Sequence, residues 1–259
     1  MHTASAAVAD PVSSKVPQVT LAFWVAKILA TTVGETGGDA LSMTLDLGYA
    51  VSTLIFLAVF AVTVTAQVAS RRCRPAFYWA VVVATTTVGT TASDYFDRTL
   101  GLGYVKSSSV LLAAVIAVLA AWHFSTGAIG FDRVTSRRDE VFYWVTILVS
   151  NTLGTALGDF VATTTGLGFE GGAAIFAALL VLVAAVHRFT RAPAALLFWA
   201  AYVLTRPLGA TLGDTLTKPR AEGGLAVGRI TSSLVISAGM VAVVAFTSWR
   251  RRVPARIPA

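Results

Sequence analysis

The sequence predicts an all-α, polytopic membrane protein with eight transmembrane helices arranged in four pseudo-symmetric two-helix repeats. Hydrophobic residues make up 56% of the chain and charged residues only 13%, a composition far from that of a soluble domain of 259 residues. In addition, one skeleton returns four times: a Trp, a Gly ten residues later, and an Asp five residues after that Gly. Such regular self-similarity is typical of tandem structural repeats.

Eight apolar runs are close to the roughly 20 residues that a helix needs to cross a bilayer. They fall at 19–40, 47–69, 76–96, 104–126, 140–162, 168–188, 194–216 and 226–248. We expect one transmembrane domain over 15–249, with repeats at about 15–70, 71–125, 136–190 and 191–249. A flexible cytoplasmic tail, 1–14, precedes it, and a basic cytoplasmic tail, 250–259, follows it.

The repeat spacing predicts how the helices are related. The Trp residues are 55, 65 and 55 residues apart, so equivalent positions in the two halves differ by 120. Each unit contains two helices, so all four units enter the membrane from the same side and are related by axes along the membrane normal, unlike inverted repeats. We therefore expect the first helices of the four units to gather around a centre. The anchors are Trp24, Gly34, Gly38, Asp39; Trp79, Gly89, Ser93, Asp94; Trp144, Gly154, Gly158, Asp159; and Trp199, Gly209, Gly213, Asp214.

The distribution of basic residues predicts the orientation of the chain. Thirteen Lys and Arg residues flank the helix ends shared with the termini, and five flank the opposite ends. Because basic residues in short loops stay on the cytoplasmic side, both termini are expected there. The formal charge of +7 then mainly reflects membrane topology. The basic residues are scattered over several loops, which argues against nucleic-acid binding. A single cysteine, Cys73, excludes a disulfide framework.

Counted from the Trp of each repeat, small residues stand at positions +10 and +14. They form Gly-x-x-x-Gly in three repeats and Gly-x-x-x-Ser in the second. In lipid, small residues four apart let two helix backbones approach closely and gain dispersion contacts. We expect helix packing through Gly34, Gly38, Gly89, Ser93, Gly154, Gly158, Gly209 and Gly213.

A polar stripe lies on another face of the same helices. Positions +8, +12 and +15 fall within about 60° of one another on a helix. They hold Thr32, Thr36, Asp39; Thr87, Thr91, Asp94; Thr152, Asp159; and Thr211, Asp214. Four inward carboxylates would repel one another unless protons or cations lay among them, which indicates a cation site. If instead the Trp lies at one interface, an Asp about 22 Å further on lies near the opposite headgroups and pairs locally with Lys106 or Arg98.

The repeats differ at three charged positions. Glu35 stands one turn before Asp39, so the two carboxylates can share a ligand or a proton. Lys27 and Arg206 are the basic residues within the predicted helices. We expect Arg206, which precedes a helix-bending proline, to pair with Glu35 or with another repeat's Asp. Lys27 either serves as a further charge partner or snorkels to the cytoplasmic interface.

The repeat motif, from the aromatic-Trp pair through Thr-x-Gly to Gly-Asp, resembles a family of bacterial membrane proteins of unknown function. The resemblance covers nearly the whole chain from Lys15 to about Trp249. It implies four tandem repeats of two transmembrane helices each, and with them a multi-pass protein of the bacterial cytoplasmic membrane. It implies no activity and no functional residues.

The residue pattern favours a secondary transporter or exporter of a cation. Carboxylate and hydroxyl oxygens suit a hard divalent metal such as manganese, or sodium and protons, although the metal itself stays open. The alternatives are a structural or scaffold membrane protein, or a passive channel, with the Asp residues in local pairs at the outer rim. No Ser/His or His/Glu constellation occurs within the helices, so an enzyme is not expected. We expect no cofactor, and as partners only the lipid bilayer and a cation.

Overall fold

The computed structural model describes residues 15–70, 74–127, 129–130, 134 and 136–250. The predicted tails and Cys73 lie outside these residues, except for Arg250. The described chain is helical throughout, apart from short connections. Its long helices are α1 (Leu21–Asp39), α2 (Gly48–Ala69), α3 (Pro75–Asp94), α4 (Tyr104–Thr126), α5 (Arg137–Asp159), α6 (Gly168–Phe189), α7 (Ala194–Thr217) and α8 (Arg229–Arg250).

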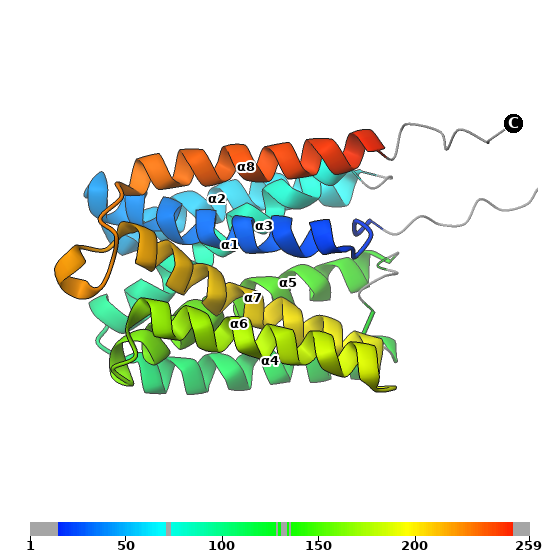
Figure 1. Ribbon diagram of the computed structural model, residues 1–259. Helices are drawn as coiled ribbons and strands as arrows, with labels where there is room; N and C mark the ends of the chain where they lie inside the picture. The colour runs from blue at the N-terminus through cyan, green and yellow to red at the C-terminus, as the bar shows by residue number, and fades with distance from the viewer. Residues whose placement is uncertain (1–14, 71–73, 128, 131–133, 135, 251–259) are drawn as a thin grey trace, which may run out of the picture.

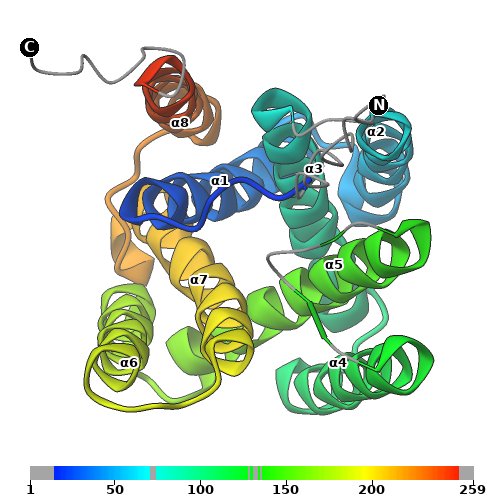
Figure 2. The ribbon, with the colours of Figure 1, turned by 90° about the vertical axis from the view of Figure 1, so that its right-hand side faces the viewer.

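The helices form two shells around a central axis. Viewed along that axis, α1, α3, α5 and α7 make an inner ring, while α2, α4, α6 and α8 lie outside it (Figure 2). Each inner helix contacts the next, and α7 closes the ring on α1. Each outer helix packs mainly on the inner helix of the following repeat, so that α8 returns to α1. This arrangement ties every repeat to its successor.

The ends of the helices define the two ends of the bundle. Helix α1 begins and α8 ends at the same end, because every repeat crosses the bundle twice (Figure 1). At the opposite end, α1, α3 and α5 each continue directly into one turn of π-helix: Ala40–Thr44, Tyr95–Thr99 and Phe160–Thr164. The repeat Asp is the residue just before each π turn. In the fourth repeat, α7 instead runs on to Thr217 and ends at Lys218.

The outer helices expose long apolar surfaces. In the described chain, six helices are long and apolar enough to cross a membrane: α2, α4, α6 and α8, together with α5 and α7. The four outer helices bury only 11–22% of their most apolar window, whereas α5 and α7 bury 67% and 61%. These features indicate a membrane protein. Helices α1 and α3, predicted as spans, are not among the six, although they lie in the inner ring beside α5 and α7.

Glycines bring the inner helices together in a cyclic pattern. A Cβ on Gly89 of α3 would lie 2.8 Å from the main-chain carbon of Asn151 in α5, and one on Gly154 would lie 2.5 Å from the side chain of Arg206 in α7. Likewise, Gly34 of α1 lies against Thr86 of α3, and Gly209 of α7 lies against Thr31 of α1. In every case the +10 position of one helix contacts the +7 position of the next, so the inner ring has no room for larger residues there.

An aromatic layer fills the axis at the end where the inner helices begin. Tyr78 and Tyr143 are joined by a hydrogen bond of 2.8 Å between their hydroxyls, and Trp199 packs edge-on to Tyr143. The tryptophans of the second, third and fourth repeats are 3–6% exposed, which makes them part of the bundle core. Their neighbours in the ring enclose these three side chains at the end of the bundle where the inner helices begin.

We predict that substituting Ala for Gly89 lowers the stability of the bundle, because the added methyl group meets the backbone of α5. The expected loss is about 1–3 kcal/mol, the usual cost of overpacking a tight contact. Thermal unfolding of the detergent-solubilised protein measures it. Gly239→Ala in α8 is the matched control, since a Cβ there meets nothing within 4 Å. Equal melting temperatures for the two variants would contradict this packing.

Candidate functional site

The four repeat Asp side chains lie at the end of the bundle opposite the chain termini. Each occupies the same position near the end of its inner helix and is only 1–3% exposed. The structure arranges them as two pairs, with a basic side chain between the members of each pair. The pairs are Asp39 with Asp214, and Asp94 with Asp159.

The first pair belongs to a cluster of three carboxylates. Three carboxylate oxygens, one from each of Glu35, Asp39 and Asp214, lie within 4.8 Å of one another, and all three residues are buried. The Lys218 ammonium lies 3.3 Å from Asp39 Oδ2 and 3.2 Å from Asp214 Oδ1. Arg229, at the start of α8, approaches Asp39 Oδ2 at 3.4 Å. This cluster, Glu35, Asp39 and Asp214, is called the acidic triad below.

Lys218 reaches the acidic triad because α7 ends there. Its amide nitrogen donates the last helical hydrogen bond, to the Asp214 carbonyl, and the chain then folds back over the end of α7. Burial lowers the pKa of the Lys218 ammonium, but the nearby carboxylates of Asp214 and Asp39 raise it further than burial lowers it. The net pKa is above the usual value, so the side chain stays protonated between these two partners.

The second pair is bridged by Arg98. Its Nε is 2.8 Å from Asp94 Oδ1, and its Nη2 is 3.7 Å from Asp159 Oδ2. Arg98 and Lys218 occupy the same repeat position, +19, in the second and fourth repeats, 120 residues apart. Each bridges its own Asp and the Asp of the next repeat. The charged end of the bundle is therefore pseudo-twofold, although the helices around it are pseudo-fourfold.

Arg206 lies in the middle of the inner ring. One of its terminal nitrogens is 2.9 Å from Glu35 Oε2 and donates to the hydroxyls of Thr90 and Thr155 at 2.6 Å each. The three acceptors are the +11 residues of α1, α3 and α5, so one side chain links all four inner helices. The side chain is 0% exposed. The expected pairing of Arg206 with Glu35 is present.

Lys27 differs from both expectations. The residue is fully buried, and its ammonium lies 4.2 Å from the centre of the Tyr202 ring. It makes no ion pair with a carboxylate, and its nitrogen has no hydrogen-bond partner in the described part of the chain. Lys27 faces the axis from α1, so its side chain cannot snorkel to a headgroup, and the cation–π contact takes the place of a charge partner.

The threonine hydroxyls at +8 and +12 do not reach the carboxylates. Each donates to a carbonyl of its own helix, as Thr32 does to Ile28 at 3.0 Å, and Thr36 also accepts a hydrogen bond from Ser233 in α8. This face contacts the outer helices, because the side toward the axis is set by +7, +11 and +15, four residues apart. The others with such internal bonds are Thr87, Thr91, Thr152 and Thr211.

Comparison with family models decides the affiliation of the chain. A model described as a Repeat of Unknown Function (DUF347) matches four times, at residues 22–73, 77–128, 142–192 and 197–253. The chain belongs to this repeat family. The four DUF347 matches coincide with the four two-helix units, as the sequence resemblance implied. No curated protein and no solved structure matches the chain.

Arg98, considered from sequence as a local partner of the repeat Asp, does pair with Asp94. Two bases and two threonines of this DUF347 chain were missed as site residues from sequence: Lys218, Arg229, Thr90 and Thr155. A signal for Lys218 existed, since it stands 120 residues after Arg98, the spacing that relates the two halves. Thr90 and Thr155 share position +11 with Glu35. Arg229 has no basic equivalent at the corresponding place in the other repeats, so no pattern pointed to it.

We predict that Glu35→Gln and Arg206→Met each destabilise the bundle by about 3–5 kcal/mol, because each leaves its partner as an uncompensated buried charge. The double variant should recover part of this loss, since it removes both charges. Unfolding free energies of the three variants in detergent give the coupling. Glu170→Gln, at an exposed carboxylate of α6, should have almost no effect. Simple additivity of the two single losses would argue against the pair.

Proposed function

We propose that the chain is a secondary transporter that binds a hard cation at the acidic triad. The observation that supports this is the convergence of three buried carboxylates within 4.8 Å in a bundle with apolar outer helices. Oxygen ligands at about 2.0–2.6 Å on opposite sides of one cation lie up to about 5 Å apart, so the spacing suits a single ion. With no thiolate or imidazole among these ligands, manganese, magnesium, calcium or sodium is favoured over copper or zinc.

In this proposal Lys218 acts as a tethered counter-cation. Its ammonium lies between Asp39 and Asp214, where an entering cation would bind. A cation and the Lys218 charge therefore compete for the same oxygens, and cation binding displaces the ammonium or makes it release a proton. Where the ammonium releases its proton, cation binding is coupled to proton release. Lys suits this role because it is a single point charge on a flexible stem and loses its proton under strong perturbation.

The other half of the bundle has a fixed charge at the same place. Arg98 bridges Asp94 and Asp159, and a guanidinium remains protonated in proteins. We infer that the Arg98 pair holds the helices in register while the Lys218 pair exchanges its cation. In membrane context, the proposal places all eight helices across a bacterial cytoplasmic membrane with both termini cytoplasmic, so that the acidic triad is near the outer side.

A structural role is the second candidate, and one observation favours it. Every repeat Asp already has a basic partner within 3.7 Å. In a structural role, these ion pairs serve to hold the ends of the four inner helices together. A passive channel along the axis is disfavoured, because Arg206 and the hydrogen-bonded Tyr78 and Tyr143 fill the axis at two levels. Flux and cation binding separate transport from a structural role.

We predict that Asp39→Asn and Asp214→Asn each reduce cation flux into proteoliposomes by about tenfold or more, since even the loss of an outer-shell partner costs about that much. Flux of manganese, magnesium, calcium and sodium is followed with ion-sensitive dyes, and a pH dye reports proton counterflow. Asp46→Asn, at an exposed carboxylate in the loop before α2, is the matched control. Wild-type flux equal to that of empty liposomes, for all four ions, would sink the proposal.

Cation binding should also be visible in stability. A ligand at about 100 times its Kd stabilises the folded state by about 2.7 kcal/mol, so the transported cation should raise the melting temperature of the wild type. Lys218→Gln should increase this shift, because it removes the competing ammonium, whereas Asp214→Asn should abolish it. A structural role predicts no cation-dependent shift in any of these proteins.

A further inference from the structure

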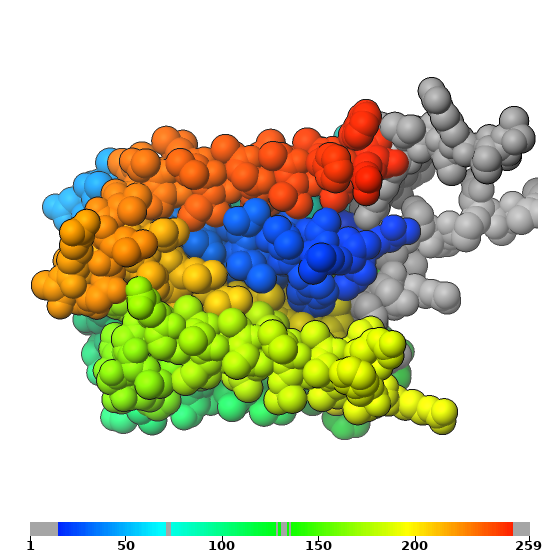
Figure 3. All heavy atoms as spheres, viewed as in Figure 1, coloured from blue at the N-terminus to red at the C-terminus, as the bar shows by residue number. Residues whose placement is uncertain are grey.

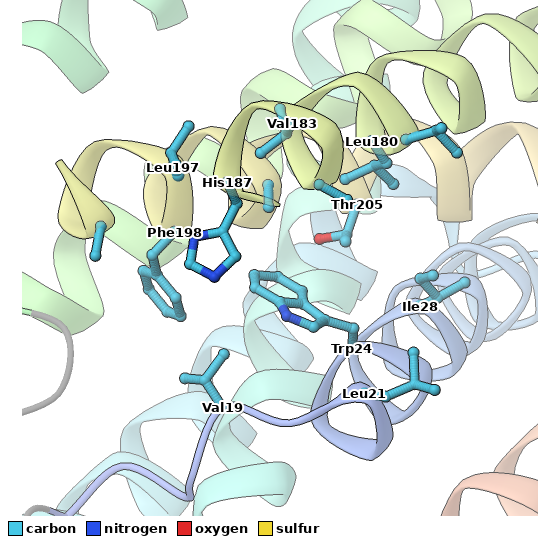
Figure 4. Close-up of a pocket in the computed structure, with 14 residues that line it drawn as sticks. Val19, Leu21, Trp24, Ile28, Leu180, Val183, His187, Leu197, Phe198 and Thr205 are labelled. Atoms are coloured by element: carbon cyan, nitrogen blue, oxygen red, sulfur yellow. The ribbon is translucent and has the colours of Figure 1, made fainter. Parts of the chain in front are cut away.

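A groove of about 520 Å³ opens on the side of the bundle between α1, α6 and α7. In the space-filling view, α1 is exposed between α8 and α6 on this side (Figure 3). Trp24 of α1, His187 of α6 and Phe198 of α7 converge around the groove (Figure 4). The rest of the lining is aliphatic except for Thr205, whose hydroxyl donates to the Tyr202 carbonyl. The groove is independent of the acidic triad, which lies at the other end of the bundle.

Comparison of the repeats explains the groove: the residue that covers the inner helices in the first two repeats is replaced by an exposed His187 in the third. His187 stands 43 residues after its Trp, as do Gln67 and Trp122 in the first two repeats. Trp122 is 0% exposed, stacks on Phe142 and donates from Nε1 to Asp139. Gln67 is 1% exposed and donates to the carbonyl of Lys15. His187 of α6, in contrast, is exposed and does not cover the inner helices α1 and α7.

The fourth repeat is also covered. There Pro17, Gln18 and Thr20 help to line a pocket of about 20 Å³ beside α8. The groove of about 520 Å³ belongs to the third repeat, where the equivalent residue, His187, is exposed. A lateral opening between apolar helices faces acyl chains in a bilayer, so its occupant must have an apolar part.

The chemistry at one end of the groove selects a negative headgroup. His187 and Arg188 lie in the last turn of α6, and Arg191 lies in the connection to α7. The N-terminal residues of α1 and α7, Leu21 and Ala194, line the groove at the same end, where the dipoles of these two helices add positive potential and that of the α6 C-terminus opposes it. From that end, the lining on α1 runs from Leu21 to Ile28, about 10 Å at 1.5 Å per residue.

We propose that this groove binds an anionic phospholipid, with one acyl chain between α1 and α6 and the phosphate beside Arg188 and Arg191. The basic residues complement the charge of the phosphate, and the apolar lining of the groove covers part of the acyl chain. The lipid takes the place that the Trp122 indole fills in the second repeat. The site is thus a specific lipid-binding position on an otherwise uniform apolar surface.

The test uses the delipidated full-length protein in detergent, titrated with phosphatidylglycerol or phosphatidylcholine and followed by native mass spectrometry. His187→Trp should weaken phosphatidylglycerol binding about tenfold or more, because losing the burial of two methylene groups already costs that much. The matched control, Ile116→Trp, adds the same indole to an exposed position of α4 away from the groove and should bind as the wild type does.

The headgroup is tested separately. Arg188→Gln with Arg191→Gln should lower phosphatidylglycerol affinity about 30-fold while sparing the zwitterionic phosphatidylcholine, since each basic residue near an anionic lipid contributes about 1 kcal/mol. This pair also serves if His187→Trp does not fold. Equal binding of both lipids by the wild type, or unchanged binding in His187→Trp, would overturn the proposal. So would a wild-type dimer that His187→Trp converts to a monomer, which would assign the groove to a second copy of the chain.

Discussion

The close approach of the four inner helices is the constraint on which the rest of the structure depends. In lipid no hydrophobic force drives helices together, so contact between backbones must supply the attraction. The glycine at +10 of each inner helix leaves space on the helix surface, and the +7 residue of the next helix packs into that space. This contact repeats around the closed ring. Because the ring is this tight, whatever faces the axis is fully buried, including charged groups.

Burial makes the charged positions costly, and the structure compensates for most of them locally. Around the acidic end, six buried carboxylates lie near four bases: Arg98, Arg206, Lys218 and Arg229. The sixth carboxylate is that of Asp97, which accepts a hydrogen bond from Ser93. Two negative charges are therefore in excess among these groups if every group is ionised, which leaves room for protons or a cation. Deeper in the ring, the buried Lys27 nitrogen has the Tyr202 ring as its partner and no hydrogen bond among the described residues.

Departures from fourfold symmetry carry the functional argument. At position +19, Arg98 and Lys218 occur in alternate repeats, and the two differ in chemistry: one charge is fixed, and the other can be displaced or deprotonated. At the position 43 residues after the Trp, two repeats cover the inner helices with protein and the third leaves a groove. Thus the geometry that the four repeats share builds the scaffold, and the residues at which they differ create the two candidate sites.

The sequence by itself determined the helix count, the four repeats and the places, Glu35 and Arg206, at which the repeats differ in charge, because hydrophobic length and residue spacing are local properties of the chain. The sequence pattern predicted that the polar residues at +8 and +12 face the central axis. In the structure the residues at +7 and +11 face it, and those at +11 of α3 and α5 accept hydrogen bonds from the Arg206 guanidinium. One residue rotates a side chain by 100°, and only contact with neighbouring helices fixes which side faces the axis. The pairing of Asp39 with Asp214 through Lys218 likewise depended on the tertiary structure, since it joins the first and last repeats across the closure of the ring.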